Sequence, residues 1–167
     1  MAVLAISACG GAEQRKAKYL EKGKAYIEQQ NFDKAKVELK NVLQIDPKHS
    51  EAYYLFGEIA ERQQNWEQAF GNYSKAVDLN PDYVEARSRL GRLYLLSGNA
   101  DKAAEMMEAI LARQPDNVSG KTLKAAIMSK KGDVKGALRE AEALCALDHH
   151  NCCVWHIHTH LYHRGRD

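Results

Sequence analysis

The chain has 167 residues, which is enough for one domain or one stack of small repeats with a buried core. Apolar residues make up 45% and charged residues 28%, and the formal net charge is only +2. This balance excludes the strongly basic surface of a typical nucleic-acid-binding protein. Three prolines and eleven glycines are too few for a linker-rich or disordered chain.

Residues 1–15 are expected to form a tail ahead of the folded part. The segment Ile6-Ser7-Ala8-Cys9 resembles the lipobox of bacterial lipoprotein signals, in which the cysteine is lipidated and becomes the mature N-terminus. No Lys or Arg precedes Cys9, however, and the apolar run is shorter than a normal signal core. The segment is therefore either the end of a truncated lipoprotein signal or a chance match. With lipidated Cys9, we expect attachment to the membrane on the periplasmic face of a bacterial cell envelope; without it, we expect a cytoplasmic protein.

From residue 16 onward, four columns of residues recur at a step of 34 residues. The columns are Gly23, Gly57, Gly91 and Ala125; Asn31, Asn65, Asn99 and Asp133; Ala35, Ala69, Ala103 and Ala137; and Pro47, Pro81 and Pro115. Four separate columns at one period are very improbable by chance. They indicate a protein built from repeats.

Each column has a physical reason. The two columns of small residues let the two helices of a repeat approach closely, where larger side chains would overpack the crossing. The Asn and Asp column lies in the turn, where a side-chain oxygen can cap the second helix. The prolines follow the second helix, because a residue without an N–H ends it. These positions predict helices near residues 16–29, 33–45, 50–63, 67–79, 84–97, 101–113, 118–131, 135–147 and 152–163.

The repeat resembles the tetratricopeptide repeat (TPR) family, whose pattern is W-x2-L-G-x2-Y, then A-x3-F, then A and P. Repeat 50–83 carries Tyr53, Phe56, Gly57, Ala69, Tyr73, Ala76 and Pro81 at these places. Repeats 16–49 and 84–117 match it also, repeat 118–151 is weaker, and residues 152–167 supply only a first helix. The resemblance implies an all-α fold, a right-handed superhelical solenoid of four helix hairpins plus one extra helix.

In this family the first helices of the repeats line a concave face, so the resemblance implies a groove for an extended peptide or a partner helix. The expected groove residues are Leu20, Lys24, Ile27, Tyr54, Glu58, Ser88, Arg92 and Leu95. Tyr54 is the expected aromatic anchor. The alternative is an ordinary solvated surface that binds nothing in particular. We do not expect the carboxylate clamp of the chaperone-binding members, because only the charges of Lys24 and Arg89 survive at the matching positions and Glu85 would repel a carboxylate.

Six of the seven histidines lie close to the C-terminus. Three of them, His156, His160 and His163, would share one face of the last predicted helix. Imidazoles at that spacing can bind zinc, copper, nickel or haem iron, and Cys152 and Cys153 add soft ligands nearby. Neither CxxCH nor HExxH occurs in the chain. The tail is therefore either a metal- or haem-binding module or a terminal helix of unusual composition.

The last predicted helix has no second helix to cover it. Its Trp155 and Tyr162 would stay uncovered, and a terminal repeat needs a polar outer face to remain soluble. We therefore expect head-to-tail stacking of copies into a homo-oligomer or a filament. The competing hypothesis is that the last helix folds back as its own cap.

The repeat pattern predicts a non-catalytic scaffold that binds a protein or peptide partner. No nucleophile–base pair, phosphate loop or paired acid departs from the pattern, so we expect no enzyme activity, no catalytic residue and no cofactor. We also expect no nucleic-acid partner. More narrowly, residues 19–47 together with the lipobox resemble the repeat lipoproteins of bacterial exopolysaccharide and PEP-CTERM protein-sorting systems, and those that assemble pilus secretins. This resemblance implies a role in an envelope export or assembly system.

Overall fold

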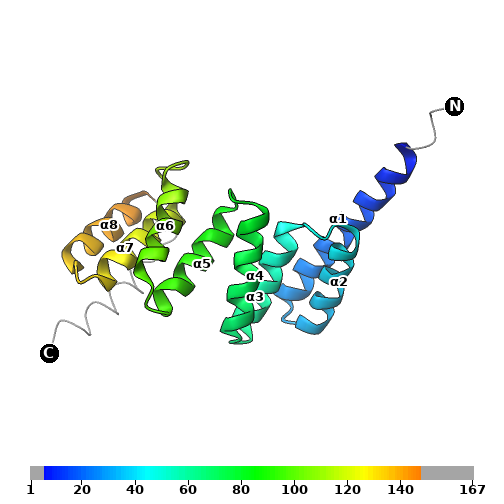
Figure 1. Ribbon diagram of the computed structural model, residues 1–167, viewed down its shortest axis with the longest axis horizontal. Coiled ribbons are helices and arrows are strands. Elements are labelled where there is room, and N and C mark those ends of the chain that lie inside the picture. The colour runs from blue at the N-terminus through cyan, green and yellow to red at the C-terminus, as the bar shows by residue number, and fades with distance from the viewer. Residues whose placement is uncertain (1–5, 148–167) are drawn as a thin grey trace. The chain divides into compact units, whose positions relative to one another are not determined.

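The computed structural model describes the backbone of residues 6–147 and the side chains of residues 11–144. Every regular element within these residues is an α-helix (Figure 1). The helices are α1 (Ile6–Glu28), α2 (Phe32–Ile45), α3 (Ser50–Arg62), α4 (Trp66–Leu79), α5 (Val84–Leu96), α6 (Ala100–Leu111), α7 (Val118–Lys130) and α8 (Val134–Leu147). The prediction of an all-α chain is thus confirmed for the described residues.

The helix bounds agree with the sequence prediction within two residues for α2 to α8. The exception is α1, which begins at Ile6 rather than at residue 16 and so enters the segment that was expected to be a tail. Residues 12–16 are Ala-Glu-Gln-Arg-Lys, all of them good helix formers, which extend the helix ahead of the first repeat. The ninth predicted helix, 152–163, lies outside the described residues.

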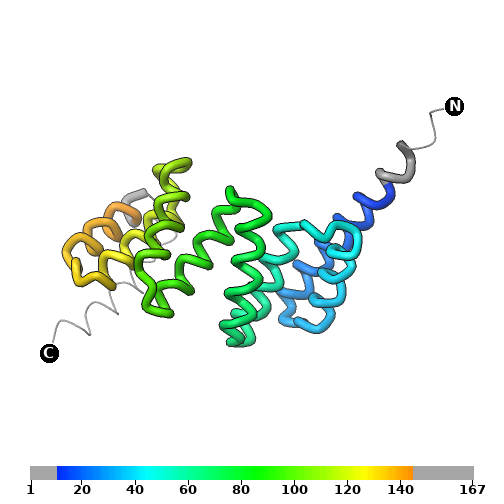
Figure 2. Tube along the Cα trace, in the orientation of Figure 1, coloured from blue at the N-terminus to red at the C-terminus, as the bar shows by residue number. Residues whose placement is uncertain are grey.

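The chain divides into two compact units, which we call the N-terminal unit (1–81) and the C-terminal unit (82–167). Figure 2 shows the path of the chain within each unit as consecutive hairpins. In the N-terminal unit α1 packs on α2 and α3 on α4; in the C-terminal unit α5 packs on α6 and α7 on α8. Each predicted repeat is therefore one helix hairpin, and each unit holds two of them.

The turn inside each hairpin has the same backbone geometry. The residue two positions before the second helix adopts the left-handed conformation: φ is 57° at Gln30, 59° at Gln64, 83° at Gly98 and 92° at Gly132. The residue after each of these donates its N–H to a carbonyl five residues back, as in Asn31 N to Tyr26 O at 2.8 Å. This is the Schellman arrangement, which satisfies carbonyls at the end of the first helix.

The residue that completes this arrangement also starts the second helix. Side-chain oxygens of Asn31, Asn65 and Asn99 accept from the N–H three residues on, at 3.3, 3.2 and 3.2 Å. Asp133 does the same for Gly136 at 2.8 Å. The predicted caps are confirmed in all four repeats. One residue thus ends one helix through its backbone and begins the next through its side chain, which explains why the turn is so short.

The small columns lie at the helix crossings, as predicted. The four alanines Ala35, Ala69, Ala103 and Ala137 are fully buried. A Cβ added at Gly23 would lie 3.0 Å from Leu39 Cδ2, and one at Gly57 would lie 2.6 Å from two ring atoms of Tyr73. Both contacts join the two helices of one repeat. The glycines therefore permit a close approach that any side chain would obstruct.

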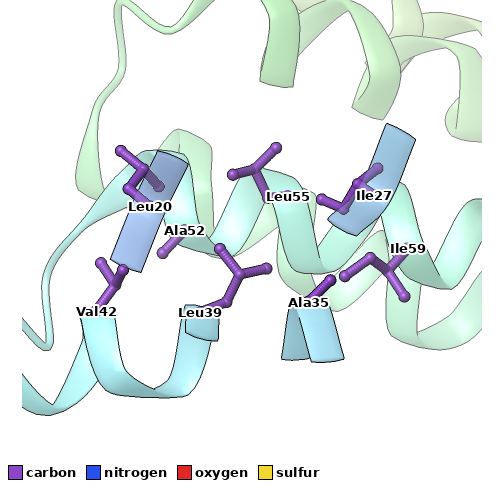
Figure 3. Packing of buried hydrophobic residues seen from close by; sticks show 8 residues of the cluster. All are labelled: Leu20, Ile27, Ala35, Leu39, Val42, Ala52, Leu55 and Ile59. Atoms are coloured by element: carbon purple, nitrogen blue, oxygen red, sulfur yellow. The ribbon is translucent and has the colours of Figure 1, made fainter. Parts of the chain in front are cut away.

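Around these crossings, each unit has its own apolar core. In the N-terminal unit the core cluster is formed by Leu20, Ile27, Ala35, Leu39, Val42, Ala52, Leu55 and Ile59 (Figure 3). In the C-terminal unit Leu123 and Ile127 of α7 pack with Ala103 of α6, flanked by Met106 and Met107. The cores hold the first helices of neighbouring repeats side by side, which determines the surface described next.

Candidate protein-binding surface

The predicted groove residues all lie on the first helices of the repeats. Within the N-terminal unit α1 packs on α3, and within the C-terminal unit α5 packs on α7. We call the surface of each such helix pair the first-helix face of its unit. Five of the eight predicted groove residues belong to the N-terminal unit and three to the C-terminal unit, and each face is described by itself.

Two predicted groove residues, Leu20 and Ile27, belong to the core instead. Their exposed fractions are 9% and 3%, and Figure 3 shows them among the side chains that α2 and α3 contribute to the cluster. They contact the protein interior because α3 covers this side of α1. The assignment of these two positions to an open groove was therefore wrong, although their placement on the first helices was right.

Lys24 reaches across from α1 to α3. Its ammonium lies 2.9 Å from Glu51 Oε1 and 3.5 Å from Glu21 Oε1. The hydrogen bond with Glu51 is the main reason why the pKa of Lys24 lies above its usual value, and it outweighs the opposing effect of burial. The lysine is thus held in its charged form, and its charge is neutralised within the unit.

Glu58 is also paired, here with a residue of its own helix. Its Oε1 accepts from Arg62 Nη2 at 2.6 Å, one turn along α3. Arg62 also approaches the Ile27 carbonyl at the end of α1, at 3.5 Å. The second predicted charge of this face is therefore compensated too. Lys24 and Glu58, the two predicted charges of this face, are thus both paired within the unit.

Tyr54 lies between this face and the core. Its side chain is half-buried against the core cluster, and its ring centre lies 5.6 Å from that of Tyr73 in a tilted arrangement. Tyr73 is fully buried and donates its hydroxyl to Glu61 Oε2 at 2.7 Å. The position of Tyr54 is thus fixed from behind by a buried, hydrogen-bonded ring. An aromatic side chain held in this way suits the predicted anchor role, which stays a prediction.

In the C-terminal unit the three predicted groove residues lie on α5. Arg92 is exposed, whereas Ser88 and Leu95 are half-buried. The sequence analysis missed the neighbouring Leu96, whose exposed fraction is 73%. The equivalent positions of the other repeats hold the charged residues Glu28, Arg62 and Lys130. A leucine in this otherwise charged column could have identified Leu96 from the sequence.

The remaining predicted sites cannot be placed. Cys9 lies in α1, but its side chain is outside the described residues. Trp155, Tyr162, His156, His160 and His163 also lie outside them. Within the part of the chain that is described, no three His, Cys, Asp or Glu side chains gather closely enough to hold a metal ion. No described helix is both long enough and apolar enough to cross a membrane.

Comparison with solved structures shows the same fold. The crystal structure of MamA is 24% identical over 78% of this chain and 77% of that one, with a TM-score of 0.65. The structure of YrrB, described as a TPR protein with an unusual peptide-binding site, is 14% identical over 89% and 76%, with a TM-score of 0.66. A Thermobaculum terrenum O-GlcNAc transferase mutant is 19% identical over 81% of this chain but only 26% of that one, with a TM-score of 0.71. The predicted all-α TPR solenoid is thereby confirmed.

Comparison of the sequence with protein families identifies the kind of TPR protein. No curated protein matches the sequence. A family model does, over residues 8–148, and these residues span all four hairpins with their shared columns and caps. Because this match covers far more than half of the sequence, the chain belongs to the TPR family described as the cytochrome c-type biogenesis protein H TPR domain.

Proposed function

We propose that the chain is a non-catalytic scaffold whose first-helix faces bind a segment of a partner protein. One observation carries this proposal: the residues that repeat and the residues that vary are separated in space. The columns shared by all repeats are buried at helix crossings or engaged in turns. The first-helix positions differ from repeat to repeat, as in Lys24, Glu58 and Arg92. A surface that changes along a constant framework can recognise one particular partner.

The partner's pathway is suggested by the family. Since the family is described by cytochrome c-type biogenesis, we propose that the partner is a protein of that process. The peptide-binding site named for YrrB supports a peptide segment as the form in which the partner is bound. Lipidation of Cys9 and an envelope location are compatible proposals. So is end-to-end association through Trp155 and Tyr162. Neither the family match nor the similarity to YrrB favours the alternative of a metal- or haem-binding module.

The proposal is tested by selecting binders from a displayed library of random twelve-residue peptides on the immobilised chain. We expect peptides that bind above the level of a blank surface. The double variant Tyr54→Ala and Arg92→Glu should lower the affinity for these peptides. It removes the half-buried Tyr54 from the N-terminal face and the exposed Arg92 from the C-terminal face. The exposed residues Val37 on α2 and Lys75 on α4 provide the matched control, Val37→Ala with Lys75→Glu.

Circular dichroism should show unchanged helix content in both variants. Binders that lose affinity only for the first-helix variant support the proposal. If no peptide binds, or if the second-helix control weakens binding as much, the first-helix faces do not have the proposed role.

A further inference from the structure

The two first-helix faces can be compared residue by residue. The repeat step of 34 residues places equivalent positions of the two units 68 residues apart. In the N-terminal unit, α3 carries three carboxylates: Glu51 and Glu58 pair with cations of this face, and Glu61 accepts from Tyr73. The equivalent positions on α7 are Ser119, Ala126 and Ser129, and α7 contains no Asp or Glu at all. The C-terminal face has therefore lost these three carboxylates, and the carboxylate of its first helix is the exposed Glu85 at the start of α5, two turns before Arg92.

The cations that these carboxylates neutralise are nevertheless present. Arg92 is equivalent to Lys24, and Lys130 is equivalent to Arg62. In the N-terminal unit Lys24 pairs with Glu51 at 2.9 Å and Arg62 with Glu58 at 2.6 Å. In the C-terminal unit the same positions oppose Ser119 and Ala126, which carry no charge.

Arg92 and Lys130 are both exposed, and among residues 11–144 no ion pair joins either of them to a carboxylate. The other two lysines of α7 are paired: Lys121 with Asp116 at 2.7 Å and Lys124 with Glu140 at 2.5 Å. Arg92 and Lys130 thus differ from their counterparts Lys24 and Arg62, which pair with α3 carboxylates.

An exposed apolar side chain lies beside these cations. Leu96 is one turn beyond Arg92 on α5, so that both side chains project from the same side of the helix. Its exposed fraction of 73% is the largest among the exposed large hydrophobic side chains that the structure describes. In the N-terminal unit, the contact between Arg62 and the Ile27 carbonyl joins the ends of α3 and α1. Because Lys130 is equivalent to Arg62 and Leu95 to Ile27, we expect Lys130 to lie beside the end of α5, where Leu95 and Leu96 are.

We propose that the C-terminal first-helix face binds an acidic segment of the partner protein, with carboxylates at Arg92 and Lys130 and an apolar side chain on Leu96. This inference rests on the proposed scaffold function and adds the chemistry of the partner. In the C-terminal unit, carboxylates of the partner take the place that Glu51 and Glu58 have in the N-terminal unit. Charge-assisted hydrogen bonds to Arg and Lys are among the strong hydrogen bonds in proteins. Nucleic acid fits less well, because residues 82–147 carry eleven basic and nine acidic side chains, far from a strongly basic surface.

The sharpest test restores the missing carboxylates. In the double variant Ser119→Glu and Ala126→Glu, the unit rebuilds the pairs seen in the N-terminal unit, and Arg92 and Lys130 remain in place but neutralised. Lys135 on α8 provides a control, since it is exposed and Lys135→Glu changes the net charge by the same amount. A second variant, Arg92→Gln with Lys130→Gln, removes the cations themselves. Circular dichroism of each variant checks that the helices remain.

Random twelve-residue peptides are selected on the wild-type chain and on each variant. We expect wild-type binders to be enriched in Asp and Glu, and this enrichment to disappear on both double variants but to persist on Lys135→Glu. For one selected peptide, fluorescence anisotropy should show affinity falling about tenfold or more when its Asp and Glu are changed to Asn and Gln. The double variants should show the same loss with the unchanged peptide.

The outcomes separate this inference from the proposed function. If peptides bind but carry no excess of Asp or Glu, or if acidic peptides bind Ser119→Glu with Ala126→Glu as tightly as wild type, the acidic partner is wrong and the scaffold stands. If no peptide binds at all, both are wrong. A single-stranded DNA oligonucleotide or an anionic phospholipid vesicle that binds more tightly than the acidic peptides, with the same dependence on Arg92 and Lys130, would also overturn the inference.

Discussion

In repeat 50–83 of the N-terminal unit the ring of Tyr73 fills the space beside Gly57, and in repeat 84–117 of the C-terminal unit the space beside Gly91, one repeat further on, is filled by Leu123 and Met106. The left-handed turn residues differ as well, since Gln30 and Gln64 stand where the C-terminal unit has Gly98 and Gly132. The caps and the buried alanines remain the same. The repeat therefore constrains where small residues and caps must lie, while each unit fills its core and turns with its own side chains.

The surfaces differ more than the cores do. On the N-terminal first-helix face Lys24 pairs with Glu51 and Arg62 with Glu58, and Arg62 also contacts the end of α1, so that these side chains help to hold α1 and α3 together. The C-terminal face keeps two cations without these partners. The two faces thus differ in charge: one pairs its cations within the unit, and the other keeps Arg92 and Lys130 without such a carboxylate.

The largest effect is expected at the helix crossings. A Cβ at Gly57 would meet the ring of Tyr73 at 2.6 Å, and this ring is fully buried and hydrogen-bonded. We expect Gly57→Ala to lower the free energy of unfolding by roughly 1–2 kcal/mol, even after the better helix propensity of alanine is included. Gly91→Ala should cost less, because its nearest neighbour is the end of the flexible Leu123 side chain. Urea denaturation measures both.

Gly71 provides the control for this comparison. It lies within α4, and a Cβ there would meet nothing within 4 Å. Gly71→Ala should therefore raise stability by about 1 kcal/mol through helix propensity alone. Equal losses at Gly57 and Gly91 would mean that the tyrosine and leucine crossings are equally rigid.

Removal of a helix cap should lower the free energy of unfolding equally in both units. Asn65 and Asn99 accept at 3.2 Å in the same way, one in each unit. We expect Asn65→Ala and Asn99→Ala each to destabilise by about 1 kcal/mol. Hydrogen exchange followed by mass spectrometry can assign each loss to its own unit. A loss confined to one of the two variants would show that the caps contribute unequally despite their shared geometry.

The turn residues should respond in opposite directions. Gln64 has φ 59°, a conformation that costs a residue with a Cβ roughly 1–2 kcal/mol, whereas glycine adopts it freely but loses more chain entropy on folding. We expect Gln64→Gly to stabilise the N-terminal unit by roughly 0.5–1 kcal/mol and Gly98→Gln to destabilise the C-terminal unit by a similar amount. Thermal denaturation of the two single variants measures the effect. Shifts of the same sign would contradict the role assigned to the left-handed turn.

The smallest effect is a pH dependence limited to the N-terminal unit. Burial raises the pKa of Asp46, but the hydrogen bonds from Lys16 Nζ and from the Lys48 N–H lower it more, so that it lies below its usual 3.8. A carboxyl whose pKa is lowered by folding stabilises the protein above its unfolded pKa, and this contribution is lost as the pH falls through the folded value. Val84 and Gln114 stand at these positions in the C-terminal unit and do not titrate.

We therefore expect Asp46→Asn to be less stable than wild type at neutral pH by no more than about 1 kcal/mol, since the pair is near the surface. The difference should shrink as the pH falls below about 4. Urea denaturation at several pH values measures it. A difference that is constant from neutral to acidic pH would show that the Lys16–Asp46 pair contributes nothing through its charge.

Much of the fold follows from the sequence because its determinants are local and recur in register. A cap acts on the next helical turn, a proline on the residue before it, and a small residue on the crossing beside it, so 34-residue columns suffice to place α2 to α8. The start of α1 does not follow, because no repeat column precedes residue 16 to mark it.

The surface was decided by tertiary packing. Leu20 and Ile27 read as groove positions by their place in the repeat, yet α3 covers them. Likewise, the charges of Lys24 and Arg92 look alike along the chain. Whether each is neutralised depends on the side chain that the adjacent first helix brings to it, Glu51 for Lys24 and the uncharged Ser119 at the equivalent position for Arg92. Periodicity determines which face of a helix a residue occupies, but burial and charge at that face come from neighbours 27 residues away in the chain, which only the packed structure brings together.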